Sequence, residues 1–125
     1  MLRLSRIAAP LAAAGVALGT TLIPASASPA PSYVQVTEKE FTITLSRLKV
    51  HQGSAIVGLL NAGMDNHDLV IQSNAKGSKP IKFSQLSPGS HTSKTLKLAP
   101  GKYTLWCSIA NHRQLGMVAP LTVTR

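Results

Sequence analysis

From Ser32 onward, apolar and polar residues alternate in short runs, and this alternation is typical of strands with one face in water. Clear examples are residues 33–37 and 41–46. Residues 54–60 are apolar on both faces, which predicts a central buried strand. Further short strands are expected at 67–71, 95–98, 103–107 and 121–124. No stretch of useful length repeats with a helical period.

Glycine, proline and asparagine separate these runs. Residues 61–63 (Asn-Ala-Gly) end one strand, and Pro100-Gly101 makes a tight turn before the next. Residues 73–90 are rich in turn residues and lysines, so we expect a long surface excursion with one short strand or helical turn near 81–83. Pro120 cannot donate a backbone hydrogen bond, so it is expected at a sheet edge or bulge. The pattern predicts an all-β sandwich or barrel.

The first residues of the chain have the organisation of a secretory signal. Arg3 and Arg6 precede an apolar run over residues 7–23, and Ala25-Ser26-Ala27 supplies a small-x-small cleavage pattern. We therefore assign residues 1–27 to a signal peptide and residues 28–125 to one exported domain, in the periplasm, the cell envelope or the extracellular space. The alternative is an uncleaved membrane anchor, for which the run is short and interrupted by glycine and proline.

The charge of the chain is strongly basic. Thirteen lysines and arginines face four acidic residues, a net charge of +9, and removal of residues 1–27 leaves +7. Such a charge favours encounter with acidic partners or anionic surfaces and weakens with salt. Nucleic acid is not expected as a partner, because the lysines are scattered singly and aromatic residues make up only 4% of the chain. A generic solvated basic surface is the plainer interpretation.

The single cysteine, Cys107, cannot form a disulfide within the chain. It is an inert thiol, an intermolecular link or a metal ligand. His112 follows five residues later and Met117 five residues after that. Thiolate, imidazole and thioether form a soft ligand set that copper prefers, and a trigonal His₂Cys site with a weak axial methionine is typical of electron transfer.

A second imidazole is available at His67, just after the turn at 61–63. Taken alone, a histidine in the position of His67 is more often an ordinary residue at a strand end than a metal ligand. A methionine in the position of Met117 is more often part of the core than an axial ligand. His51 and His91 have no ligand neighbours and are expected on the surface. A tetrahedral zinc site from Cys107, His67 and His112 is the main rival, although structural zinc sites favour several cysteines and seldom recruit methionine.

Two motifs resemble those of the cupredoxins, the small blue copper proteins that include plastocyanins, azurins and rusticyanins. The first is Asn-x-Gly followed by His-x-Leu within residues 61–69. The second is Gly-Lys-Tyr-x₃-Cys-x₄-His-x₄-Met over residues 101–117. The resemblance runs from about Glu38 to the C-terminus, and the second spacing is closest to the rusticyanin-like branch. It implies a Greek-key β-sandwich or barrel of about seven to eight strands.

The resemblance also implies roles for single residues. Cys107, His67 and His112 would form the trigonal plane around copper, Met117 would be the axial ligand, and the Asn66 carbonyl would approach weakly from the other side. His112 would be the electron port, within a docking patch of Met64, Ala110 and Leu115, and Trp106 would offer a second route.

One residue departs from the family pattern. Asp68 stands where the family usually has asparagine. As an acceptor for Ser108 or a backbone N–H it would still tie the ligand loops, and as an anion it is expected to favour Cu(II) and lower the potential.

The function expected from this set is a mobile single-electron carrier in the cell envelope. A filled ligand shell argues against an enzyme, and multicopper oxidases and nitrite reductases need more than the four histidines present. The expected partner is an acidic redox protein, with no small-molecule substrate, a membrane contact only through an uncleaved N-terminal segment, and a monomeric state. Alternatives are an exported copper carrier or chaperone, and an adhesion domain with a vestigial site.

Overall fold

The structure is a computed structural model that describes residue 19 and residues 21–125. Most of the predicted signal peptide, residues 1–18 and 20, lies outside the described residues. Within the described part, no helix has the length and apolar character needed to cross a membrane.

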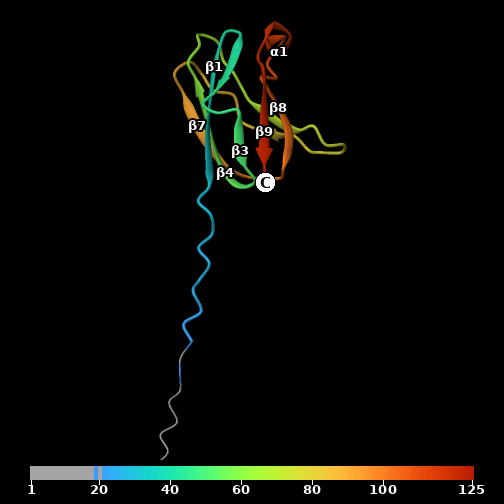
Figure 1. Ribbon diagram of the computed structural model, residues 1–125. Helices are drawn as coiled ribbons and strands as arrows, with labels where there is room; N and C mark the ends of the chain where they lie inside the picture. Colours follow the sequence, from blue (N-terminus) through green and yellow to red (C-terminus); the bar gives the residue numbers. More distant parts are fainter. Residues whose placement is uncertain (1–18, 20) are drawn as a thin grey trace, which may run out of the picture.

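The described chain folds into two β-sheets that face each other as a sandwich (Figure 1). The four-stranded sheet has the order β2-β1-β4-β7, with the bounds Thr42–Leu45, Ser32–Lys39, Gly53–Asn61 and His91–Leu98. The five-stranded sheet has the order β3-β9-β8-β5-β6, with the bounds Lys49–His51, Val118–Thr124, Gly101–Trp106, Val70–Ser73 and Ile81–Lys82. The predicted all-β sandwich is confirmed. Of the nine strands in the described chain, β3 and β6 have only three and two residues.

The core lies between the sheets and is built by the period-two pattern of the strands. In β1, Val34 and Val36 point inward and are fully buried. In β8, Tyr103 and Leu105 face inward, and the same alternation continues to Cys107, which is 0% exposed. The pattern that fills the core therefore also brings the cysteine to the end of the sandwich, because every second residue of the strand predicted at 103–107 lies on the same face.

Strand β4 is central in its sheet, as predicted, because β1 pairs with it on one side and β7 on the other. Its predicted burial on both faces is wrong for the outer face, where Ile56 and Leu60 are only partly covered. No third layer lies over this face within the described chain, so its cover comes from neighbouring side chains of the same sheet. Gly58 illustrates this, because an added Cβ would lie 2.6 Å from Gln35 Oε1.

Other strand boundaries differ from the sequence prediction. The strand expected at 67–71 begins only at Val70, and His67 forms an isolated bridge with Leu86 instead. The segment expected near 81–83 contains the strand β6. Phe83, the next residue in the sequence, is 3% exposed and belongs to the core. Pro120 was expected at an edge or bulge beside the last strand, but it lies inside β9, opposite Thr104 of β8. Strand β3 pairs with β9 only from Thr122 onward, so Pro120 is at a locally open edge of the sheet.

Candidate metal centre

The four predicted ligands come from segments that meet at one end of the sandwich. His67 lies in the connection between β4 and β5, and Cys107 follows β8 directly. His112 opens α1 (His112–Leu115), a single helical turn that the sequence pattern did not predict. Met117 lies between α1 and β9.

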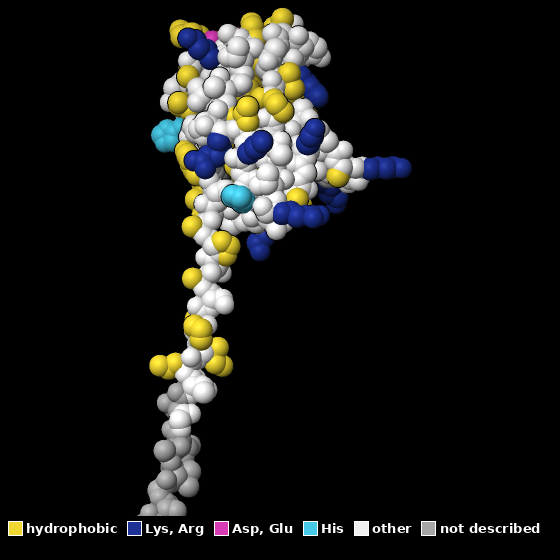
Figure 2. All heavy atoms as spheres, viewed as in Figure 1, with side chains coloured by type: hydrophobic (Ala, Val, Ile, Leu, Met, Phe, Trp, Pro, Cys, Tyr) yellow, Lys and Arg dark blue, Asp and Glu magenta, His cyan; other side chains and the backbone are white. Residues whose placement is uncertain are grey.

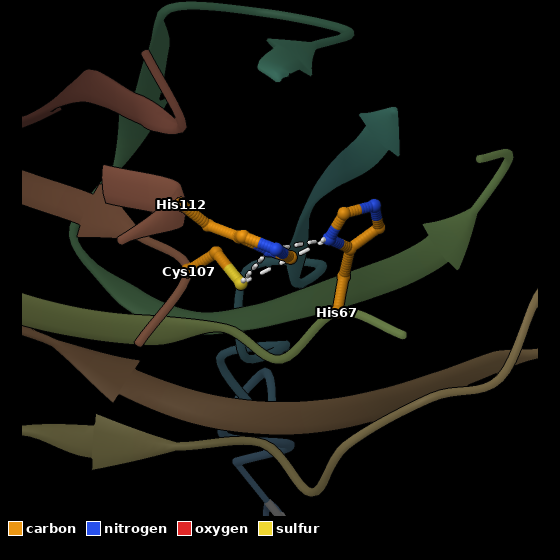
Figure 3. Close-up of side chains that lie close together, drawn as sticks. All are labelled: His67, Cys107 and His112. Atoms are coloured by element: carbon orange, nitrogen blue, oxygen red, sulfur yellow. Dashed lines mark hydrogen bonds between the residues drawn. The ribbon is translucent and has the colours of Figure 1, made fainter. Parts of the chain in front are cut away.

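Three of these side chains point toward one another (Figure 3). The Nδ1 atoms of His67 and His112 are 3.2 Å apart. Cys107 Sγ lies 3.6 Å from His112 Nδ1 and 3.9 Å from His67 Nδ1. Exposure is 0% for Cys107 and His67 and 8% for His112, so the donor atoms form a triangle shielded from water.

The size of this triangle fits a first-row metal ion. A point equidistant from atoms spaced 3.2, 3.6 and 3.9 Å apart lies about 2.1 Å from each, and metal bonds to imidazole nitrogen or thiolate sulfur are roughly 2.0–2.3 Å long. Two nitrogens and one sulfur in one plane are the equatorial set of a blue-copper site. The spacing of the donors therefore fits a first-row metal ion, and their chemical kinds match copper.

Met117 is tied to the same cluster through its backbone. Its N–H donates to the His112 carbonyl at 3.0 Å, and its own carbonyl accepts from the Cys107 N–H at 3.2 Å. The side chain is fully buried. Main-chain hydrogen bonds thus fix the thioether residue against two of the three triangle residues.

The chain reaches this geometry through an unusual backbone turn. Ala110 has φ 42° and Gly116 has φ 127°, so both ends of the turn around α1 lie in the left-handed region. At Gly116 a Cβ would also lie 2.8 Å from the carbonyl oxygen of Phe41. Glycine is required there because the turn carrying His112 and Met117 packs directly on the β1–β2 turn.

His67 is held by backbone pairing and by a buried asparagine. Its N–H donates to the Leu86 carbonyl at 3.1 Å, and its carbonyl accepts from the Leu86 N–H at 2.7 Å. The Asn61 side chain donates to the carbonyls of Asp65 and Leu86 at 2.7 and 2.9 Å and accepts from the Gly63 N–H at 2.9 Å. The predicted Asn-x-Gly turn is therefore also the support of the first histidine.

Asp68 joins the two ligand segments. Its Oδ1 accepts from the Ser108 N–H at 2.6 Å, and its Oδ2 accepts from the Ser108 hydroxyl. Both acceptor roles expected for Asp68 are present. Asp68, which follows His67, therefore binds Ser108, which follows Cys107, through two hydrogen bonds.

Glu40 was not singled out by sequence analysis, yet it contacts a predicted ligand. Its Oε1 accepts from the backbone N–H groups of Asp65 and Met64 at 2.8 Å each and lies 2.9 Å from His67 Nε2. These hydrogen bonds, that of Asp65 foremost, lower the pKa of Glu40 to about 2. Glu40 is therefore an anion at neutral pH.

Glu38 is a second missed residue, and its environment is the opposite. It points inward from β1 at 0% exposure, and neither carboxyl oxygen has a hydrogen-bond partner. Burial, followed by the negative charge of Asp68, raises the pKa of Glu38 to about 8. The side chain is therefore mainly a neutral acid at pH 7.

Burial also raises the pKa of the Cys107 thiol. Backbone hydrogen bonds from Asp68 and Ile109 oppose this rise, whereas the charge of Asp68, and that of Glu38 once it ionises above about pH 8, add to it. The thiolate needed as a ligand is therefore not favoured by the protein alone. A bound metal ion has to supply the stabilisation of the anion.

All four acidic residues of the chain lie in the segments that build this end: Glu38, Glu40, Asp65 and Asp68. Of the lysines and arginines after residue 27, only Lys39 and Arg113 lie in the same segments. On the face shown in Figure 2, lysine and arginine side chains are spread over the body of the domain.

The sequence matches a family model described as copper binding proteins of the plastocyanin/azurin family over residues 30–124. The chain belongs to this family. A search of curated proteins gave no match. As a member of the plastocyanin/azurin family, the chain carries a type 1 copper site at its cluster of His67, Cys107 and His112, to which Met117 is tied through its backbone.

Solved structures share the cupredoxin fold of this plastocyanin/azurin family member. Reduced auracyanin from Roseiflexus castenholzii has a TM-score of 0.61 and 18% identity, and the match covers 78% of this chain and 100% of that one. Auracyanin A from Chloroflexus aurantiacus has a TM-score of 0.59 and 12% identity, with coverage of 76% and 100%. A multicopper oxidase matches with a TM-score of 0.59 and 14% identity, over 78% of this chain but only 45% of the oxidase.

The remaining predicted residues are found as follows. His51 and His91 are exposed, as expected. His112 is the ligand nearest to solvent, since His67 and Cys107 are fully buried. Of the residues expected around it, Met64 and Leu115 are 85% and 50% exposed. Trp106 stacks with Arg113, whose guanidinium carbon lies 4.3 Å from the ring centroid.

Proposed function

We propose that this protein is an exported carrier that accepts and donates single electrons at one type 1 copper ion. The observation that carries the proposal is the buried triangle of His67, Cys107 and His112, with the backbone of Met117 tied to two of its members. Four protein donors leave no position for a substrate, so the protein is not expected to be an enzyme.

Each residue of the cluster has its own task in this proposal. Cys107, His67, His112 and Met117 are the residues that would hold copper. Copper supplies the redox chemistry, by cycling between Cu(I) and Cu(II) with these ligands. The backbone bonds of His67 with Leu86 and of Met117 with His112 and Cys107 limit ligand movement between the two states. Limited movement favours rapid electron transfer.

His112 would be the electron port, because it is the ligand with the most solvent access. The exposed side chains of Met64 and Leu115 give partners an apolar surface to dock against. The partners we propose are acidic redox proteins outside the cytoplasm, an inference supported by the basic charge and the signal-like residues 1–27. Association that does not slow with added salt would contradict this choice of partner.

The proposal is tested on the purified protein loaded with Cu(II). An intense thiolate-to-copper band in the visible spectrum, absent in Cys107→Ser, is expected together with the small parallel hyperfine splitting of type 1 copper in EPR. A colourless protein with ordinary tetragonal copper would refute it.

A copper carrier or chaperone would bind the same ion, so a second measurement separates the two functions. Electron self-exchange and copper dissociation are measured on the same copper-loaded protein. For an electron carrier, slow copper release is expected because the ligands are buried. Fast self-exchange is expected because the backbone hydrogen bonds limit ligand movement. Fast release with sluggish exchange would favour the chaperone.

A further inference from the structure

Glu40 connects a distant part of the chain to the first histidine. It lies in the turn between β1 and β2, whereas His67 lies in the connection between β4 and β5. One oxygen, Oε1, lies 2.8 Å from the backbone nitrogens of Met64 and Asp65 and 2.9 Å from His67 Nε2. Three nitrogen donors therefore converge on a single carboxylate oxygen.

The two ring nitrogens of His67 face different surroundings. Nδ1 lies in the triangle with Cys107 Sγ and His112 Nδ1, where a metal ligand needs a free lone pair. Nε2 faces the Glu40 carboxylate, which can only accept a hydrogen bond. A neutral ring satisfies both sides when its proton is on Nε2.

We propose that Glu40 is a positioning residue of the copper site: its carboxylate holds His67 in the Nε2-protonated tautomer with Nδ1 toward the metal, and its charge favours Cu(II) over Cu(I). The part that concerns the two copper states rests on the proposed function. The part that concerns the tautomer is a property of the protein without metal.

The packing around Glu40 supports a fixed position for its side chain. A Cβ at residue 63 would lie 2.1 Å from Oε1, so the carboxylate fills the space that glycine leaves open. The Glu40 side chain is 22% exposed and His67 is 0% exposed. The contact is therefore shielded enough for a single charge to act on the ring and on a metal ion bound at Nδ1.

A purely structural role is the competing explanation, since Glu40 also anchors the backbone of residues 64 and 65. Glu40→Gln separates the two, because glutamine keeps an acceptor oxygen and removes the charge. Glu40→Ala removes both. Asp65→Asn is the matched control: its side chain is exposed, it is two residues from His67, and it changes the net charge by the same amount.

The tautomer is measured in the metal-free protein through the ring ¹⁵N shifts of His67. Wild type and Glu40→Gln are expected to carry the proton on Nε2, and Glu40→Ala is expected to show a mixture of tautomers. An unchanged tautomer in Glu40→Ala would overturn the positioning role.

The effect of charge is measured in the copper-loaded proteins by voltammetry. Glu40→Gln is expected to shift the balance between the two copper states about tenfold toward Cu(I), a rise of about 59 mV for one electron. Asp65→Asn is expected to shift it less. Equal shifts in both variants, or none in Glu40→Gln, would overturn the role of the charge. Absence of the blue band in wild type would instead refute the proposed function, and the tautomer result would still stand.

Discussion

Replacing Glu38 by glutamine removes a carboxyl group that the fold keeps neutral. The side chain is 0% exposed, and both of its oxygens lack hydrogen-bond partners. Burial, with a smaller contribution from Asp68, raises its pKa from 4.5 to about 8. Between these two values, the folded protein carries a proton that the unfolded chain has released. The wild-type free energy of unfolding should therefore fall as pH rises from 4.5 to 8, and this contribution should be constant outside that window.

The size of the effect follows from the shift. One pKa unit corresponds to about 1.4 kcal/mol, so the full window represents about 5 kcal/mol and the part below pH 7 about 3 kcal/mol. Domains of this size are stable by roughly 5–15 kcal/mol. One buried carboxyl group should therefore change the stability of the metal-free protein by a large fraction of the total.

Urea unfolding of the metal-free protein at pH 5, 6, 7 and 8 measures this effect. The difference in unfolding free energy between Glu38→Gln and wild type should grow by about 1.4 kcal/mol per pH unit. Glu40→Gln is the control: the pKa of Glu40 is lowered to about 2, so its contribution is complete above pH 4.5 and is lost only in more acidic solution. Parallel curves for wild type and Glu38→Gln would refute the reasoning.

Three further predictions concern the ligands and their supports. Cys107→Ser should remove the visible charge-transfer band while circular dichroism shows a retained fold; a persisting band would exclude Cys107 as the ligand. Gly116→Ala should lower the unfolding free energy by about 1–3 kcal/mol, because φ is 127° and the new Cβ would lie 2.8 Å from the Phe41 carbonyl. Gly77→Ala, with φ 77° and open space around its Cβ, should lower the unfolding free energy by less. Thermal unfolding of both variants measures the difference, and equal losses would contradict the role given to the Phe41 contact. Asp68→Asn should raise the copper potential in voltammetry, because it removes a charge and keeps an acceptor for the Ser108 N–H; an unchanged potential would contradict the role given to that charge.

The sequence predicted best what is local. Cys107, His112 and Met117 follow one another within a single turn, so their spacing alone indicated a shared metal. The period-two alternation in β8 correctly placed Cys107 on the core face. His67 needed the family resemblance, because its approach depends on pairing with Leu86 across a long excursion.

Glu38 and Glu40 were not found in this way, because their contacts are not local. Glu38 is opposite Asn61 only through the parallel register of β1 and β4, and Glu40 reaches His67 from another strand connection. A weak signal existed for Glu38, which continues the inward alternation of Val34 and Val36 by two residues. The predicted strand ended at residue 37 and missed it. The four-residue helix α1 was too short to show a period.

The separation of the charges has a consequence for how the protein meets a surface. The anions share the end of the domain with the copper ligands, and Lys97, Lys102 and Arg125 lie near the turn between β7 and β8 or at the chain end. The domain is thus an electric dipole whose positive pole is remote from His112. An anionic surface attracts the positive pole, so the molecule binds with His112 on the side facing away from the surface. It then has to rotate before an electron can pass between His112 and the surface. Ions in solution weaken the capture and the misalignment together, and electron flow to such a surface should peak at an intermediate ionic strength.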